Sequence, residues 1–190
     1  MNHISGKMIV LAFLAAIIAG QAQAGEAPVC KELITAEMVE TICGATMKMS
    51  TRGRQAPDRC NDKLFNVDMQ NGNVIYFTVK TYPDNAEAVR QHERWKKAAL
   101  SNSTPEKVAK NKAEGSLYTA SFTDVAEIGG AAYERHMYTP DTKKSRIQLD
   151  ILTGHHNVEV NSDMWTGAEL PCDSDQLQAI AKEVVKTLGH

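Results

Sequence analysis

Alternation of apolar and polar residues is clearest between residues 65 and 80. Every second residue is apolar from 65 to 70 and again from 75 to 80. The pair Asn71-Gly72 lies between the two runs and supplies the positive φ angles of a tight turn. We therefore predict a β-hairpin. One face of each strand is apolar and the other mostly polar, which indicates a sheet covered more heavily on one side.

The same period of two recurs further along the chain. It predicts a second hairpin over 145–152 and 156–161. Shorter strands are predicted at 116–122 and 131–138, where the stretch EIGG forms the turn between them.

Helical spacing of apolar residues predicts three helices, at about 35–44, 85–100 and 173–188. The last has the clearest pattern, with Asp173 and Gln176 as capping residues at its start.

Two polar segments, 45–58 and 101–114, show neither period and are predicted to be surface loops. No internal repeat or domain-separating linker is apparent. Helices mixed with hairpins predict one α+β domain, with a mainly antiparallel β-sheet flanked by helices.

Residues 1–24 have the composition of a signal peptide. A single charge, Lys7, precedes an apolar run from 8 to 20, and the segment ends in Ala-Gln-Ala. Small residues at these positions suit signal peptidase. We expect cleavage after Ala24 and a mature domain over 25–190. An uncleaved anchor is the alternative, but a membrane span usually needs about 20 apolar residues.

Composition then narrows the range of partners. The chain has 21 basic and 23 acidic residues and a net charge of −2, with no long basic run. We therefore expect no binding to nucleic acid. No second apolar stretch is long enough to span a bilayer, so we expect no stable membrane insertion after signal cleavage. The predicted location is the periplasm or the exterior of the cell.

All four cysteines lie in the mature chain, and an even number in an exported protein favours disulfides. Glu26 and Pro28 interrupt the pattern that would direct lipidation of Cys30. No C-x-x-C is present, which argues against a thioredoxin-like redox site or a zinc ribbon. We predict no metal site and no cofactor.

The preferred disulfide pairing is Cys30 with Cys172 and Cys43 with Cys60. The first bond would hold the two ends of the domain together, and the second would close a short loop. The alternative pairing, Cys30 with Cys60 and Cys43 with Cys172, remains open because the first helix could pack beside the last.

Several stretches together resemble the PsbP-like family, which includes small exported cell-envelope proteins. They are the opening ITAEMVETICG, the cysteine before the first hairpin, the turn VAEIGGAAYE and the amphipathic terminal helix. The resemblance covers most of the mature chain. It implies an α/β/α sandwich around an antiparallel sheet, and it carries over no catalytic residues.

No familiar catalytic motif is present. Ser116 lacks the glycine that a serine-hydrolase elbow needs two residues later, and no phosphate-binding loop occurs. The adjacent pair His155-His156 lies beside a glycine in a predicted turn, where we expect solvated imidazoles. We expect His92 to be packed on its helix one turn from Trp95.

Three residues are candidates for binding. Trp165 and Met164 lie together in the predicted loop NSDMWTGAELPC, and exposed aromatic residues in loops often anchor partners. The alternative is that Trp165 covers an edge of the core. His136 lies in a strand between two tyrosines and is a candidate pocket residue, although packing is the stronger explanation.

These features predict a noncatalytic exported binding or protein-interaction module, with a protein partner in the cell envelope. An envelope inhibitor or immunity-type protein is a more specific alternative. An enzyme with a site of dispersed residues, such as His136, Asp150 and His155, is a second class. A pocket where a histidine meets a carboxylate would favour the enzyme, and a flat apolar patch at Trp165 would favour a protein partner.

Overall fold

The computed structural model describes residues 27–66, 73–126, 128–164 and 169–189. Its strands are β1 (Met47–Met49), β2 (Arg54–Ala56), β3 (Arg59–Asn66), β4 (Val74–Thr81), β5 (Tyr118–Val125), β6 (Ala131–Thr139), β7 (Lys144–Thr153) and β8 (His156–Met164). Its helices are α1 (Cys30–Leu33), α2 (Ala36–Cys43), α3 (Asn85–Ser101), α4 (Pro105–Ala113) and α5 (Ser174–Leu188). The fold class is α+β, as the sequence predicted.

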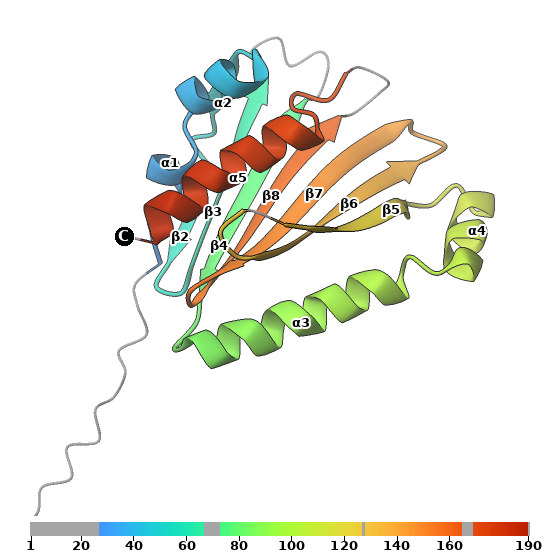
Figure 1. Cartoon of the computed structure of the whole chain (residues 1–190). Coiled ribbons are helices and arrows are strands. Elements are labelled where there is room, and N and C mark those ends of the chain that lie inside the picture. Colours follow the sequence, from blue (N-terminus) through green and yellow to red (C-terminus); the bar gives the residue numbers. More distant parts are fainter. Residues whose placement is uncertain (1–26, 67–72, 127, 165–168, 190) are drawn as a thin grey trace, which may run out of the picture.

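The eight strands form one sheet in the order β1-β3-β4-β8-β7-β6-β5, and β2 also pairs with β3. The strand pairings described are antiparallel. The last strand, β8, returns to lie between β4 and β7, so it joins the first hairpin to the second. Figure 1 shows this path, with β8 in the middle of the sheet.

The second predicted hairpin is confirmed by the antiparallel pairing of β7 with β8. β3 also pairs with β4, but most of the predicted first strand, 65–70, lies outside the described residues, and Phe65 pairs with Val74 on the face opposite Ile75 and Phe77. The connection between β7 and β8 is tight, and Gly154 has a φ of 53° there. This backbone conformation favours glycine because it has no Cβ. The predicted Asn71-Gly72 turn lies outside the described residues.

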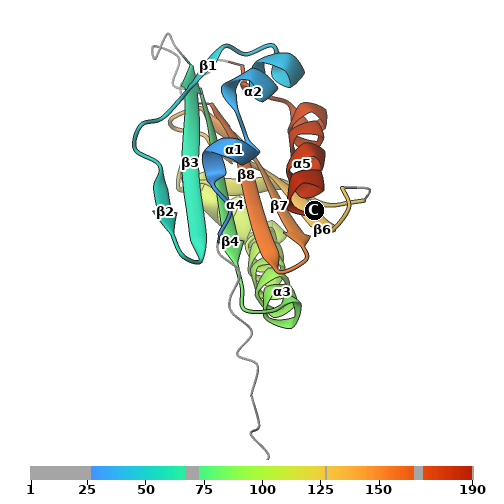
Figure 2. The same cartoon turned by 90° about the vertical axis from the view of Figure 1, so that its left-hand side faces the viewer.

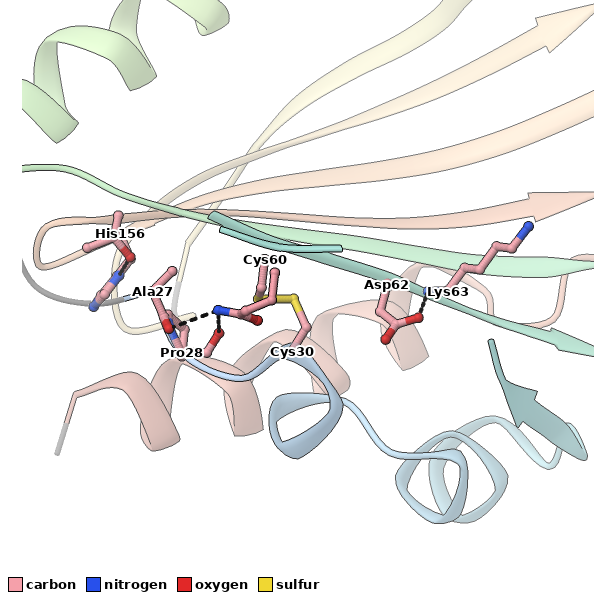
Figure 3. The surroundings of a disulfide bond; sticks show 9 residues. Ala27, Pro28, Cys30, Cys60, Asp62, Lys63 and His156 are labelled. Carbon is pink, nitrogen blue, oxygen red and sulfur yellow. Dashed lines mark hydrogen bonds between the residues drawn. A yellow bond between two sulfur atoms is a disulfide. The ribbon is translucent and has the colours of Figure 1, made fainter. Parts of the chain in front are cut away.

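One face of the sheet carries the hydrophobic core. In Figure 3 the strands run across the view, with α1, α2 and α5 on one side and α3 on the other. The fully buried residues on the α5 side include Leu64, Ile75, Phe77, Leu149, Ile151 and Val160 of the strands and Leu177, Ile180 and Val184 of α5. The apolar stripe predicted for the last helix therefore packs against the apolar face predicted for the hairpins.

Capping residues define where the helices begin. Thr35 Oγ1 accepts a hydrogen bond from Met38 N at 3.1 Å at the start of α2. Asp173 and Gln176 form a complete capping box at the start of α5, as predicted. Asp84 caps α3 through Glu87 N at 2.7 Å, whereas the Glu87 carboxylate binds Arg90 and Gln91 rather than completing a box.

Two segments predicted to be loops contain regular structure. Residues 101–114 include α4, which begins with Thr104 as N-cap and Pro105 in its first turn. These are ordinary helix-start signals that the polar composition obscured. The other segment, 45–58, contains β1 and β2, which are only three residues each and form by pairing with β3.

The two short strands cover different parts of the same edge of β3, as Figure 2 shows. β1 pairs with the end of β3 from Leu64 to Asn66, and β2 pairs with its beginning. The chain crosses between them at Gly53, which lies directly against the Asp62 carboxylate. A Cβ at position 53 would collide with that carboxylate unless the Asp62 side chain moved, so the close approach favours glycine.

The preferred disulfide pairing was wrong, and the alternative is correct. Cys30 is bonded to Cys60 and Cys43 to Cys172, with Cα–Cα distances of 5.6 and 5.2 Å. No described cysteine is free. The sequence could not show which helix each cysteine would face, because that depends on how the N-terminal segment runs over the sheet.

The N-terminal segment lies along β2, which brings Cys30 to β3. Gln55 Nε2 donates to the carbonyl oxygens of Ala27 and Pro28 at 3.2 and 3.3 Å, and Ala27 N donates to Pro57 O at 2.9 Å. Figure 3 shows Ala27 and Pro28 beside the Cys30–Cys60 bond.

The second disulfide joins the helices of the core layer. α2 packs against α5, and Cys172 stands just before the start of α5. Ser162 Oγ of β8 accepts from Cys172 N at 3.1 Å and donates to Cys172 O at 2.7 Å. The bond therefore fixes α2 to a segment already held by the sheet.

The histidine pair behaves differently from the prediction. His155 lies in the turn, but His156 is the first residue of β8 and only 8% exposed. Its Nδ1 lies 3.0 Å from Thr81 Oγ1. Burial, together with the neighbouring His155, lowers the pKa of His156 to about 4. The expectation that both imidazoles are solvated was therefore wrong for His156.

We expect removal of the Cys43–Cys172 bond to destabilise the protein more than removal of Cys30–Cys60. The bonds span 129 and 30 residues, so the chain-entropy model gives about 5 and about 4 kcal/mol respectively. Urea unfolding of the paired variants C43S/C172S and C30S/C60S measures the difference. Peptide mapping without reductant provides a direct check, and a peptide joining Cys30 to Cys172 would contradict the structure.

We expect folding stability to fall as the pH drops from about 6.5 to 4, because the unfolded state binds a proton at His156 that the folded state excludes. A shift from 6.5 to about 4 corresponds to a loss of up to about 3 kcal/mol. His156→Asn keeps a polar atom near Thr81 and should lose less stability over this range. His155→Asn is the control, and an equal acid response of wild type and His156→Asn would refute the assignment.

Candidate functional site

The face of the sheet opposite the core is polar. Side chains alternate between faces along each strand, and residues opposite one another in adjacent strands share a face. From the registers, this polar face carries Asn61, Lys63, Tyr76, Thr78, Arg146, Gln148, Asp150, Glu159, Asn161, Asp163, Tyr133 and Arg135. Several of them are buried, which is costly for polar groups unless they are paired.

Helix α3 crosses the polar face and is held there by His92. The ring of His92 is 1% exposed and packs on Tyr133 with ring centroids 5.3 Å apart. Burial lowers the pKa of His92, which keeps the imidazole neutral at neutral pH. Asn157 Nδ2 of β8 also donates to Ala88 O of α3 at 3.3 Å. The prediction that His92 is a packed histidine is confirmed.

A cleft opens between α3 and the sheet beyond this anchor. It consists of two pockets of about 300 Å³ each, which share Asn102 and Arg135. α3 lines the first pocket, whereas the second lies past the end of α3, beside α4 and β5. We call it the α3 cleft. Its first half is lined mainly by Trp95, Tyr133, Gln148, Asp150 and Glu159, and its second half by Asn111, Leu117, Tyr118, Thr119 and Met137.

Asp150 is the most perturbed acid of the first half. It lies directly opposite Glu159 in the pairing of β7 with β8. Burial raises the pKa of Asp150 to about 7, and the charge of Glu159 acts in the same direction. Arg135 Nη2, at 3.7 Å from Asp150 Oδ2, opposes the shift, as does a hydrogen bond from Gln148 Nε2 at 3.0 Å.

Glu159 and Arg135 complete the charged groups of this half. Asn161 Nδ2 donates to Glu159 Oε1 at 2.6 Å and orients that carboxylate. The lining therefore offers one guanidinium and two carboxylates. Asp150 is partly protonated near pH 7, which reduces the excess negative charge.

Tyr133 forms part of the cleft without being a reactive group. Burial, followed by the charge of Asp150, raises the pKa of Tyr133 well above its usual value. Its ring is stacked on Phe122 at a centroid distance of 5.2 Å. The phenol therefore stays protonated at neutral pH and serves as a fixed wall and hydrogen-bonding group.

The polar face continues beyond the cleft toward β4. Arg146 donates twice to Asp163, at 2.7 and 2.6 Å, across the β7–β8 pair. This bidentate pair neutralises both charges. Burial and Asp163 raise the pKa of the adjacent Tyr76. Arg146 and Asp163 therefore satisfy each other. A separate pocket of about 230 Å³ lies nearby, and its lining includes Arg52, Lys63 and Tyr76.

Of the three binding residues predicted from sequence, Trp165 lies outside the described residues, and neither Met164 nor His136 lines the α3 cleft. Met164 ends β8 and lines a separate pocket of about 140 Å³ at the end of the sheet, together with Arg146 and Asp163. His136 lies on β6, two strands from β8, and it is on the face of the sheet that α5 covers, opposite the cleft.

His136 belongs to a cluster centred on Glu134. His136 Nε2 lies 2.7 Å from Glu134 Oε1, and Ser174 Oγ donates to both carboxylate oxygens at 2.8 Å. Gln178 Nε2 adds a bond of 3.2 Å to the same carboxylate. Because the carboxylate lies between the hydroxyl and the imidazole, this cluster does not have the serine–histidine contact of a hydrolase.

The dispersed residues considered for an enzyme are also separated. Asp150 faces the α3 cleft, His136 faces α5, and His155 lies in the β7–β8 turn. Within the described part of the chain, no group of three or more His, Cys, Asp or Glu residues is arranged to hold a metal ion.

Sequence reasoning noted Trp95 and Asp150 but did not place them in one site. It missed Arg135, Gln148 and Glu159. In the sequence these residues are the polar positions of the alternating pattern in β6, β7 and β8. Such positions are interpreted as a solvent-exposed face unless a helix is known to cover them. Nothing local indicated that α3 crosses these strands.

Comparison with known protein families finds no family that matches this chain, and comparison with curated proteins finds no match either. Among the helices of the described residues, none is long and apolar enough to cross a membrane.

We expect Asp150→Asn to stabilise the protein at high pH. The folded-state pKa of about 7 lies above the usual value of 3.8, so the ionised carboxylate costs stability as the pH rises through this range. The amide imitates the protonated acid. At pH 8 the gain should be about 2–4 kcal/mol, and near pH 4 the two proteins should be similar.

Urea unfolding at both pH values measures this effect. The exposed Asp58 provides a matched control, and Asp58→Asn should show no comparable gain at pH 8. A destabilised Asp150→Asn at pH 8 would mean that the ionised carboxylate is favourably paired with Arg135, contrary to the interpretation given above.

Proposed function

We propose that this chain is an exported binding protein of the periplasm or cell exterior, and that the α3 cleft holds a small polar ligand without transforming it. Export is supported by the composition of residues 1–24 and by the two disulfides, which are typical of oxidising compartments.

One observation carries the proposal: the floor of the cleft is polar where a purely structural contact would be apolar. Gln148 and Asp150 are 7% and 4% exposed, and they lie beneath a helix. Apolar residues at these positions would pack α3 against the sheet without the free-energy cost of burying polar groups. Breaking a local rule of packing in this way is typical of functional sites.

The lining favours binding over catalysis. The residues that line the two halves include no serine, cysteine or histidine. The hydroxyl of Tyr133 is held protonated, and Asp150 accepts a hydrogen bond from Gln148. An aromatic wall with convergent polar groups is the usual composition of a small-molecule site.

The assignment to the PsbP-like sandwich family is part of this proposal. It is supported by the antiparallel sheet with α3 on one side and α1, α2 and α5 on the other. The PsbP-like family includes small exported cell-envelope proteins, which agrees with a binding role outside the cytoplasm.

Thermal unfolding of the mature protein, with disulfides intact, tests the proposal. The dialysable fraction of an envelope extract from the producing cells should raise the Tm. A ligand at about 100 times its Kd stabilises by about 2.7 kcal/mol, which corresponds to a shift of roughly 5–10 °C. Mass spectrometry of the heat-released fraction then identifies the ligand.

Two variants of α3 locate the site. Ala98 is exposed and lines the cleft, so Ala98→Trp should fill it and abolish the shift. Lys97 is exposed and does not line the cleft, so Lys97→Trp should keep the shift. No shift in the unaltered protein, or an equal shift in Ala98→Trp, would contradict the proposal.

A further inference from the structure

The two halves of the α3 cleft differ in charge and polarity. The first half, beneath Trp95, contains both carboxylates, Asp150 and Glu159. The second half contains no acidic residue, and Leu117 and Met137 give it an apolar part. A ligand that fills both halves therefore meets an acidic region and a partly apolar region.

Arg135 stands where the halves meet, because it lines both. Its only ion pair among the described residues is with Asp150, at 3.7 Å, which is longer than a hydrogen bond. Its buried Nε has no hydrogen-bond partner in the described part of the chain. The guanidinium is thus incompletely paired, and the planar group that matches it best is a carboxylate.

In the first half, two carboxylates lie close together. Residues directly opposite in an antiparallel pair have Cβ atoms about 4.5–5.5 Å apart, so Asp150 and Glu159 oppose each other at close range. A cation between them would offset this repulsion. Trp95 adds an aromatic wall, and aromatic rings attract organic cations.

We infer that the α3 cleft binds a free α-amino acid with an apolar side chain. Its ammonium group would lie between Glu159 and Asp150, its carboxylate on Arg135, and its side chain against Leu117 and Met137. This inference rests on the proposed binding function and specifies the ligand class of the same site.

The spacing of charges in the cleft supports an α-amino acid over a longer zwitterion. Arg135 and Asp150 are 3.7 Å apart, so the positions for a carboxylate and an ammonium are adjacent. An α-amino acid carries these two groups on one carbon. Longer molecules with distant charges would place one of them in the second half, away from both acids.

The pH dependence of binding distinguishes the contact made by the ligand's ammonium group from the contact made by its carboxylate. Asp150 titrates near pH 7 and faces Arg135, Glu159, Tyr133 and Gln148. A ligand that has only an ammonium group would expel the proton of Asp150. A ligand that has only a carboxylate, bound to Arg135, would favour protonation of Asp150. The amino acid carries both charges, so its affinity should change least between pH 6 and pH 8.

Isothermal titration of the mature protein with L-leucine tests the inference. The matched analogues are 3-methylbutylamine, which lacks the carboxylate, and 4-methylpentanoate, which lacks the amine. L-leucine should bind at least about tenfold more tightly than either analogue. The amine should bind more tightly at pH 8 than at pH 6, and the acid should show the reverse.

Variants assign the two contacts. Arg135→Gln should weaken L-leucine at least about tenfold and leave the amine nearly unchanged, while Glu159→Gln should weaken the amine and leave the acid nearly unchanged. Circular dichroism confirms the fold of each. Since Glu159 is only half-buried, its variant remains informative if Arg135→Gln fails to fold.

Two results would overturn the inference: an analogue that binds as tightly as L-leucine, or no binding of L-leucine and L-phenylalanine. In the second case the extract experiment separates the two proposals. A Tm shift that Ala98→Trp abolishes would leave the binding function in place with another ligand class, and no shift would remove both. Binding of L-leucine that survives in Ala98→Trp would also refute the assigned site.

Discussion

The insertion of β8 between β4 and β7 is the contact on which the rest of the structure depends. It joins the two hairpins into one sheet and so continues the same alternation across all their strands. On one side β8 contributes Val158 and Val160 to the core, and on the other it contributes Glu159 to the cleft. A slip of one residue in its register would exchange these faces and destroy both.

Local patterns were enough to predict the β7–β8 hairpin, the helices α2, α3 and α5 and the two-sided character of the sheet. Each of these is decided by residues within about a dozen positions of one another. The short strands β1 and β2 could not be predicted in this way, because they form only through pairing with β3. The cleft likewise depends on where α3 crosses strands that follow it by some 30 to 60 residues in the sequence.

The disulfides illustrate the same limit from another side. Loop length ranked the pairings by entropy, but the bonds that form are decided by which surfaces meet. Cys30 reaches β3 because the N-terminal segment lies along β2, and Cys43 reaches Cys172 because α2 packs on α5. Polar residues posed a similar problem, since Glu159 and Gln148 look like surface residues until the covering helix is placed.

One edge of β3 is covered by two short strands in place of one long strand, and this affects the tendency of the protein to aggregate. A long unpaired strand edge is a template onto which another chain can add, and it promotes aggregation. Here β1 and β2 occupy the two ends of that edge, and the crossing at Gly53 interrupts it in the middle. At the opposite edge, β5 carries an irregularity between Thr119 and Ser121 that disturbs its hydrogen-bonding row. Both margins of the sheet are therefore poor templates for a second molecule.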